Sequence, residues 1–381
     1  MNKFKVFFIA GWYPSEKDPT SGVFVKEHAK AASLNDDIVV VSSEGVEERL
    51  QSLYKIEDQL EYGLRTLRVK YQKSPVPKTT YPLYLWSIFK SYKHLVNEGF
   101  EPDIIHANVF TTGVPAVLLG KIFDLPVVIT EHYTGFPRKT LSGFNKLKAK
   151  FAMNQADLLL PVSKYLRDCI KDYGIENDFH VVPNVVDTDL FYPHSNIRGA
   201  KNKQILLVAL LSSQKGVPYL LKAVTKLSKT RKDFTLEIVG DGPKKAQYER
   251  QVSELGIKNI VTFHGMKSKE KVAEFMRESH LFVLPSIFET FGVVLIEAMA
   301  SGLPVVTTDI GGPNELVTQE VGELVPSKDS EALARTLDDV LDNLESYSPK
   351  RIRRYARDNF SLNSVGKELH KVYREISVEK H

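Results

Sequence analysis

Short apolar runs alternate with longer amphipathic segments along the whole chain, and this alternation is typical of parallel sheets covered by helices. In the first half, the runs predict strands at 5–11, 37–43, 103–108, 126–132, 158–163 and 180–184. A second series predicts strands at 204–211, 235–242, 260–265, 281–286 and 304–309. The pattern therefore predicts an α/β protein with two doubly wound, Rossmann-like domains.

The two series are separated by the segment DTDLFYPHSNIRGAKNKQ, which is rich in turn formers and poor in periodic apolar residues. We place the interdomain linker near Asn196 because composition changes there. The predicted domains cover residues 1–195 and 196–355, and a charged helical segment at 356–381 could pack back on the first domain.

Composition agrees with two ordinary globular domains, because 381 residues exceed the size at which one core stops growing. The single cysteine, Cys169, excludes an internal disulfide framework and fits a reducing cytoplasm. The opening MNKFKVFFIAGWYP is too short for a spanning helix and lacks a small-residue cleavage site, so we interpret it as a buried strand. We expect a cytoplasmic protein.

A net charge of +4 is too small to indicate nucleic-acid binding, and no basic stripe with interleaved stacking aromatics is present. Two stretches are locally basic, one between Glu61 and Glu98 and one between Glu131 and Asp157. They contain Arg65, Arg68, Lys70, Lys73, Lys78, Lys90 and Lys93, and then Arg138, Lys139, Lys146, Lys148 and Lys150. Such faces suit an anionic surface, such as the inner face of the plasma membrane, or an anionic substrate. A merely solvated helix face explains them equally well.

Two glutamates flank the strand-to-helix passage SIFETFGVVLIEAMASGLPVVTTDIGG. Glu289 follows a predicted strand, and a helix is predicted to begin near Gly292, whose first N–H groups form a site suited to phosphate. Glu297 lies roughly 7 Å further along the helix axis. Carboxylates accept two hydrogen bonds from adjacent sugar hydroxyls, so the order of hydroxyls, phosphates and hydroxyls suggests a nucleotide diphosphate sugar. The alternative is that both glutamates are exposed residues flanking a helix.

This segment resembles the signature of the retaining glycosyltransferases of family 4 (GT4, glycosyltransferase group 1), which have the two-domain GT-B fold and carry E-x7-E here. Glu289 and Glu297 match that motif. Further similar pieces, in the family's order, are GVFVKEHAKAAS, DIIHAN, VITEHYTG, PVSKYLRD, VPNVVDTDLF, QKGVPYLLKAV, IVGDGP and FHGMKSKEKVAEFM. The resemblance implies an acceptor-binding first domain and a nucleotide-sugar-binding second domain.

The resemblance also implies a role for each matching residue. Glu297 would hold the ribose hydroxyls and Glu289 those of the donor sugar. The remaining implied contacts bind the phosphates or the sugar of the donor. They are the Lys215 side chain and backbone groups of Gly22, Phe291, Gly292 and Val293. His132 would lie at the reaction centre; a histidine buried and satisfied by backbone is the alternative.

The family usually has Gly-Arg where this chain has Ala209 and Leu210, which removes one cation from the diphosphate. Arg138 or Lys139 could substitute. The family also implies retention through a short-lived oxocarbenium ion, without a metal, because Lys215 and helix N-termini supply the positive charge. Cysteine and histidine spacing offers no zinc site.

We expect a UDP- or GDP-sugar as co-substrate, no separate cofactor, and a saccharide or lipid-linked acceptor in polysaccharide, lipopolysaccharide or glycolipid synthesis. A nucleotide-sugar epimerase of the same fold and a non-catalytic nucleotide-sugar-binding protein remain alternatives. A dinucleotide oxidoreductase would depend on IVGDGPKK, which lacks the third glycine of that fingerprint.

Overall fold

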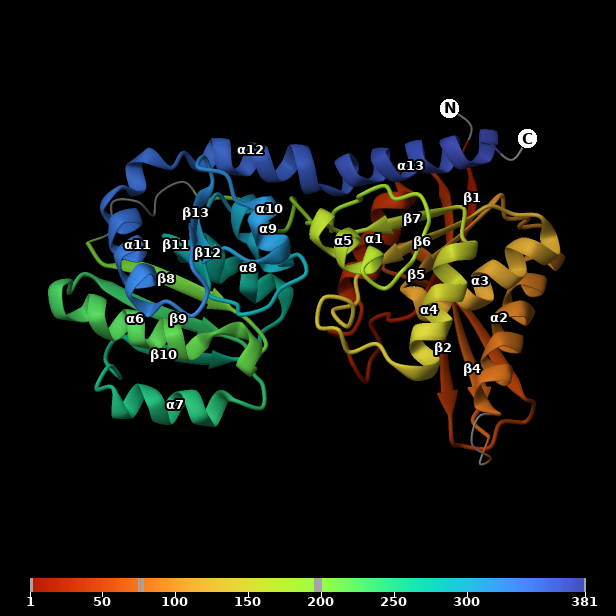
Figure 1. Ribbon diagram of the computed structural model, residues 1–381, viewed down its shortest axis with the longest axis horizontal. Coiled ribbons are helices and arrows are strands. Elements are labelled where there is room, and N and C mark those ends of the chain that lie inside the picture. Colours follow the sequence, from red (N-terminus) through yellow and green to blue (C-terminus); the bar gives the residue numbers. More distant parts are fainter. Residues whose placement is uncertain (1–2, 75, 77–78, 195–200, 380–381) are drawn as a thin grey trace. The chain divides into compact units, whose positions relative to one another are not determined.

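The computed structural model describes residues 3–74, 76, 79–194 and 201–379, and divides them into two compact units (Figure 1). Unit 1 comprises residues up to Val185 together with those from Leu362 onward, and unit 2 comprises Val186–Ser361. Each unit is built on one sheet with parallel strand pairing, except for one antiparallel pair in unit 1. The predicted α/β class with two doubly wound domains is confirmed.

Unit 1 has a seven-stranded sheet in the order β3-β4-β2-β1-β5-β6-β7. Its strands are β1 (Lys5–Ala10), β2 (Asp37–Val46), β3 (Tyr54–Glu61), β4 (Leu64–Gln72), β5 (Ile104–Asn108), β6 (Val127–Glu131) and β7 (Leu158–Pro161). Its helices are α1 (Val23–Ser33), α2 (Thr80–Asn97), α3 (Phe110–Phe123), α4 (Gly143–Gln155), α5 (Lys164–Lys171) and α13 (Leu362–Glu379).

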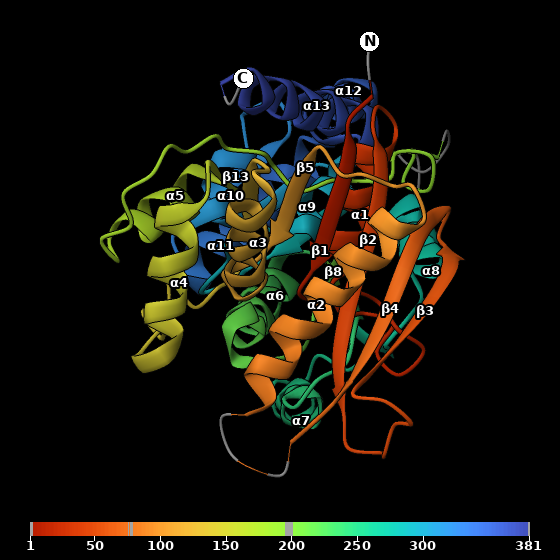
Figure 2. The ribbon, with the colours of Figure 1, turned by 90° about the vertical axis from the view of Figure 1, so that its right-hand side faces the viewer.

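Helices cover both faces of this sheet because alternate residues of each buried strand point in opposite directions. On β1, Phe8 belongs to the core shared with α1 and α13, whereas the ring of Phe7 packs at 5.6 Å from Tyr92 of α2. Figure 2 shows α2 lying across β2 and β4, with which it is in contact.

Unit 2 has a six-stranded sheet in the order β10-β9-β8-β11-β12-β13. Its strands are β8 (Lys203–Val208), β9 (Phe234–Val239), β10 (Val261–Gly265), β11 (Leu281–Leu284), β12 (Val305–Thr308) and β13 (Gly322–Val325). Its helices are α6 (Val217–Thr230), α7 (Lys245–Glu254), α8 (Lys269–Glu278), α9 (Val293–Ala300), α10 (Gly311–Leu316), α11 (Ser330–Asp342) and α12 (Pro349–Phe360), with the 3₁₀ turns η1 (Ser213–Lys215) and η2 (Leu344–Ser346).

The grouping of residues differs from the predicted ranges 1–195, 196–355 and 356–381. The first unit ends at Val185, and the expected linker near Asn196 lies outside the described residues. The C-terminal segment is divided, because α12 belongs to unit 2 while α13 packs on α1 in unit 1. The cause is apolar burial: Leu369, Val372 and Tyr373 of α13 are completely buried in the core of unit 1.

The predicted strand at 180–184 is wrong. This segment is extended and hydrogen-bonded to β7, with the His180 and Val182 N–H groups donating to the carbonyls of Leu159 and Pro161. The ladder does not continue because Pro161 has no N–H to donate. Conversely, the strands β3, β4 and β13 were not predicted.

None of the helices in the described part of the chain is long and apolar enough to span a membrane.

Candidate functional site

The loop after β11 carries Glu289 and leads directly into α9. Gly292 caps this helix with φ 92°, a conformation that favours glycine. The N-cap residue is a glycine and has no side chain to accept hydrogen bonds from the first N–H groups of the helix, and such groups can bind an anion. Gly312 of α10 supports the loop from behind: a Cβ on it would lie 2.0 Å from the Thr290 carbonyl oxygen.

A second loop brings Lys215 to Glu289. Gly216 follows Lys215 with φ 65°, and a Cβ there would lie 1.8 Å from the carbonyl oxygen of Pro285. The neighbouring Ile287 N–H donates to the Gln214 carbonyl at 2.7 Å. These backbone contacts hold the two loops together, and Lys215 Nζ lies 2.5 Å from Glu289 Oε2.

Glu297 lies on α9 and is almost completely buried, at 5% exposure. Its Oε1 lies 3.4 Å from Nζ of Lys269, the first residue of α8. The Glu289 side chain is also largely buried, at 13% exposure. The alternative in which both glutamates are exposed helix-flanking residues is therefore wrong, since buried carboxylates need charged or hydrogen-bonding partners. Sequence reasoning missed Lys269 because no spacing along the chain relates α8 to α9.

The turn after β8 holds the two residues that replace the family's Gly-Arg. Leu210 is 58% exposed, and the Ala209 carbonyl oxygen would lie 1.9 Å from a Cβ on Gly240. Gly242 likewise faces the backbone of Leu211. The two glycines of IVGDGPKK therefore permit close packing of two loops within unit 2.

Gly22 caps α1 in unit 1 with φ 64°. A Cβ on Gly22 would lie 2.3 Å from the carbonyl carbon and oxygen of Trp12. The glycine thus allows the start of α1 to lie against the loop that follows β1, at the carboxyl end of this strand. This is the edge at which open parallel sheets bind ligands.

His132 follows β6 at the same edge of the unit 1 sheet. Its ring is buried, with its centroid 4.5 Å from that of Phe24 and 5.2 Å from that of His28. Burial lowers the pKa of His132 well below its ordinary value, and His28 and His106 lower it further, while Asn184 acts in the opposite direction. Neither ring nitrogen has a hydrogen-bond partner of acceptable geometry among the described residues. A neutral imidazole with this capacity could hydrogen-bond a sugar hydroxyl.

Glu131, beside His132, is a residue that sequence reasoning did not single out. Its two carboxyl oxygens accept hydrogen bonds from the backbone N–H groups of Phe110, His132 and Tyr133 at 2.7–2.9 Å. Burial raises its pKa to about 7, although these three donors act in the opposite direction. The carboxyl group therefore fixes the backbone that carries His132; its signal in the sequence was an acid at the end of an apolar strand.

The predicted residues accordingly form two groups, one in each unit. Lys215, Glu289 and Glu297 gather around the start of α9 in unit 2, together with the backbone of 291–293. Gly22 and His132 lie in unit 1.

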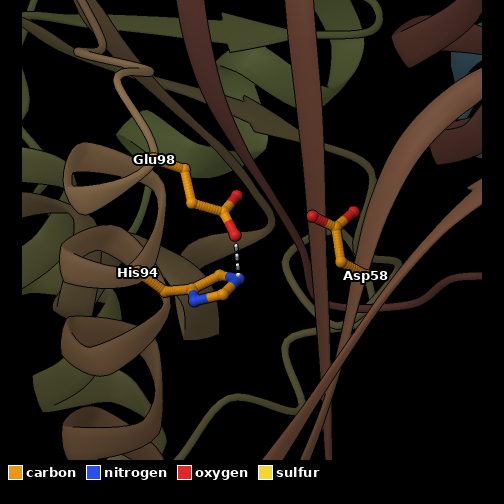
Figure 3. Close-up of side chains that lie close together, drawn as sticks. All are labelled: Asp58, His94 and Glu98. Atoms are coloured by element: carbon orange, nitrogen blue, oxygen red, sulfur yellow. Dashed lines mark ion pairs between the residues drawn. The ribbon is translucent and has the colours of Figure 1, made fainter.

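One cluster has a composition that could hold a metal ion. Asp58 of β3, His94 of α2 and Glu98 after α2 point toward one another (Figure 3). Arg65 already ion-pairs with both carboxylates, at 2.5 Å for Asp58, and His94 Nε2 lies 3.3 Å from Glu98. The guanidinium supplies the positive charge that a cation would bring, so we assign the cluster a structural role.

Two family profiles match consecutive parts of the chain. Residues 21–190 match the family described as Glycosyltransferase Family 4, and residues 191–359 match the family described as Glycosyl transferases group 1. An MMP α-(1→4)-mannosyltransferase of Mycolicibacterium hassiacum is 31% identical over 71% of this chain and 70% of its own length. An uncharacterized glycosyltransferase of Methanocaldococcus jannaschii is 28% identical over 77% of this chain and 81% of its own.

Solved structures share the fold at low identity. Sucrose-phosphate synthase from Thermosynechococcus elongatus superposes with a TM-score of 0.76 at 21% identity, covering 98% of this chain and 99% of that one. Anabaena HepE in complex with UDP-glucose has a TM-score of 0.73 at 20% identity, covering 98% of this chain and all of that one.

Proposed function

Because the chain belongs to glycosyltransferase family 4 and has the GT-B fold, we propose that this glycosyltransferase moves a sugar from a nucleotide diphosphate sugar to a hydroxyl acceptor, with retention at the anomeric carbon. The observation that carries the proposal is the Lys215–Glu289 pair beside the start of α9, where the N-cap residue is Gly292, with Glu297 on the same helix.

The proposed donor contacts follow the order of groups along α9. Glu297 accepts hydrogen bonds from the ribose hydroxyls, the N–H groups of 291–293 bind the diphosphate, and Glu289 binds hydroxyls of the transferred sugar. A UDP- or GDP-sugar is the donor class we propose, and the UDP-glucose complex of the similarly folded HepE supports it.

Charge complementarity supports a metal-independent departure of the diphosphate. Lys215 is a mobile point charge, and in the structure described here it ion-pairs with Glu289. An arriving diphosphate would compete for the ammonium group, which would leave Glu289 able to accept hydrogen bonds from the sugar. The positive end of α9 adds to the stabilisation of the leaving group.

In the proposed reaction, the acceptor hydroxyl attacks the anomeric carbon from the face that the diphosphate leaves. The C–O bond to the diphosphate breaks, a short-lived oxocarbenium ion forms, and the departing phosphate takes the acceptor proton. Neutral His132 would hydrogen-bond a hydroxyl at the reaction centre. The product is a glycoside in polysaccharide, lipopolysaccharide or glycolipid synthesis, made in the cytoplasm, where the free thiol of Cys169 is stable.

Hydrolysis of nucleotide sugars by the purified protein tests this function without a known acceptor. We expect slow release of UDP or GDP from one donor of a panel. Glu297→Ala should weaken nucleotide binding, measured by calorimetry, whereas Glu289→Ala should chiefly lower turnover. Glu254→Ala, at an exposed position of α7, is the matched control.

The same assay distinguishes the alternatives. Rearrangement of the donor sugar without an acceptor would favour an epimerase. Tight donor binding without hydrolysis or transfer would favour a non-catalytic binding protein. Unchanged affinity and rate in both glutamate variants would reject the assigned roles.

A further inference from the structure

Several of the basic side chains of unit 1 are paired with acidic side chains. Three cations of β4 and one that follows it each lie within ion-pair distance of an acid. The pairs are Arg65–Asp58, Arg68–Glu61, Lys70–Glu57 and, just after the strand, Lys73–Glu47. Lys78 lies outside the described residues. These four cations are therefore already paired with acids, and the surface of interest is the other basic stretch, on α4.

Helix α4 exposes its largest side chains instead of burying them. Phe144, Leu147 and Phe151 are 62%, 65% and 42% exposed, while the buried contacts of the helix come from Ala149, Ala152 and Met153. Their spacing of three and four residues places the three large side chains on one stripe. A row of exposed apolar side chains indicates a surface that binds a membrane or another protein.

Lysines flank this stripe on both sides. At about 100° per residue, Lys148 lies on one side of the stripe, and Lys146 and Lys150 lie on the other. The helix contains no acidic residue. Lys148 Nζ lies 5.1 Å from the ring centroids of both Phe144 and Tyr81. An apolar stripe between cations is complementary to an anionic lipid bilayer, into whose headgroup region such a helix inserts its apolar face.

A cavity of about 500 Å³ opens beside the stripe. It lies at the carboxyl end of β1, where Ala10 lines it, beside Ser43 in the second half of β2, and the start of α3 contributes Thr111 and Thr112. Seven of its eleven lining residues carry a side-chain hydroxyl, among them three tyrosines. Hydroxyls and aromatic faces together suit a saccharide or another polyhydroxylated group, and the volume is typical of ligand sites.

The cavity and the surface of α4 share two residues: Phe144 belongs to the exposed stripe, Lys148 flanks it, and both line the cavity. We propose that α4 docks on an anionic bilayer and that the cavity receives the hydroxyl-bearing headgroup of an acceptor whose lipid stays in that bilayer. The acceptor part rests on the proposed transferase function, whereas the docking part is independent of it. The acceptor class is then lipid-linked, and docking keeps the cavity mouth close to the lipid surface.

Vesicle sedimentation tests the docking. The full chain is mixed with vesicles of phosphatidylcholine alone or with 30 mol% phosphatidylserine. We expect stronger binding to the anionic vesicles, reduced at least about a hundredfold in K146E/K148E/K150E, because each cation near the surface contributes about a fivefold factor. The variant F144S/L147S/F151S should bind both vesicle types more weakly.

The matched control K222E/K229E/K258E makes the same change of charge at exposed positions of unit 2 and should bind as the wild type does. Equal binding of the wild type to both vesicle types, or wild-type binding by both α4 variants, overturns the docking. Absence of binding to either vesicle type likewise overturns the docking, and would point to a protein partner for the stripe.

Transfer assays test the acceptor class. With the donor identified by hydrolysis, dodecyl maltoside should accept the sugar faster than maltose does, and T111W, which fills the cavity, should remove this difference. Y84F, which deletes a single lining hydroxyl, provides a milder second variant with the same expected direction. Equal or faster transfer to maltose, or transfer to neither, overturns the lipid-linked class. Absence of donor hydrolysis would instead count against the proposed function and leave the vesicle result standing.

Discussion

Replacement of Gly216 by alanine should damage unit 2 because it separates the loops that carry Lys215 and Glu289. The new Cβ would lie 1.8 Å from the Pro285 carbonyl oxygen, so the loops must move apart by more than 1 Å. The positive φ of 65° costs about 1–2 kcal/mol for a residue with a Cβ. Overpacking adds about 1–3 kcal/mol, and a weakened Ile287–Gln214 hydrogen bond adds about 0.5–1.5 kcal/mol.

Gly256 provides the matched control, because its φ of 69° is similar and nothing lies within 4 Å of a Cβ added there. Gly256→Ala should therefore show only the conformational cost. The two variants should differ by about 1.5–4.5 kcal/mol, or about 3–18 °C in Tm for a domain of this size.

Thermal unfolding followed by far-UV circular dichroism measures this difference. Both tryptophans, Trp12 and Trp86, belong to unit 1, so their fluorescence reports separately on that unit. Gly216→Ala should also weaken nucleotide binding, since Lys215 moves with its loop. Equal stability of the two variants would refute the steric argument, and unchanged nucleotide affinity in a destabilised Gly216→Ala would refute the placement of Lys215 at the donor.

Three further perturbations address other parts of the chain. Leu210→Arg restores the family's cation at an exposed position, so calorimetry should show about tenfold or tighter binding of the donor nucleotide; unchanged or weaker binding would contradict this. The raised pKa of Glu131 stabilises the folded state at low pH, and this contribution is lost as pH rises from 4.5 to about 7. Glu131→Gln should remove this change in unfolding free energy with pH, which is worth about 3 kcal/mol. Urea unfolding at a series of pH values, followed by tryptophan fluorescence, measures it. An identical pH dependence in both proteins would count against the burial of an ionisable group. Tyr373→Phe removes the 2.6 Å hydrogen bond to Nδ1 of buried His106 and should lower the unfolding free energy of unit 1 by about 1–3 kcal/mol, measured by urea denaturation; a change below 0.5 kcal/mol would show that the pair is not needed.

The central strands were predictable from the sequence because burial on both faces leaves a continuous apolar run. The strand β3 was not, since it lies at the sheet edge and its sequence, YKIEDQLE, is mostly polar and partly exposed. The segment 180–184 was overpredicted, because its apolar composition does not reveal that Pro161 interrupts the ladder on the neighbouring strand.

The candidate site was predictable where its residues lie close together in the sequence. Glu289, Gly292 and Glu297 lie within nine residues, so helix geometry alone relates them. The Lys269–Glu297 pair and the buried histidines of unit 1 join segments that are distant in sequence, and only the fold brings them together. The roles of these residues toward a donor remain predictions.

The packing of α13 on α1 has a consequence for synthesis on the ribosome. Unit 1 needs Leu369 and Tyr373 to close its core, yet these residues emerge only after all of unit 2 has been translated. At about 5–20 residues per second, the first unit waits roughly 10–35 s with an open apolar groove along α1. A nascent chain in that interval offers a binding surface for chaperones, and maturation of the first unit depends on a helix that is made after unit 2.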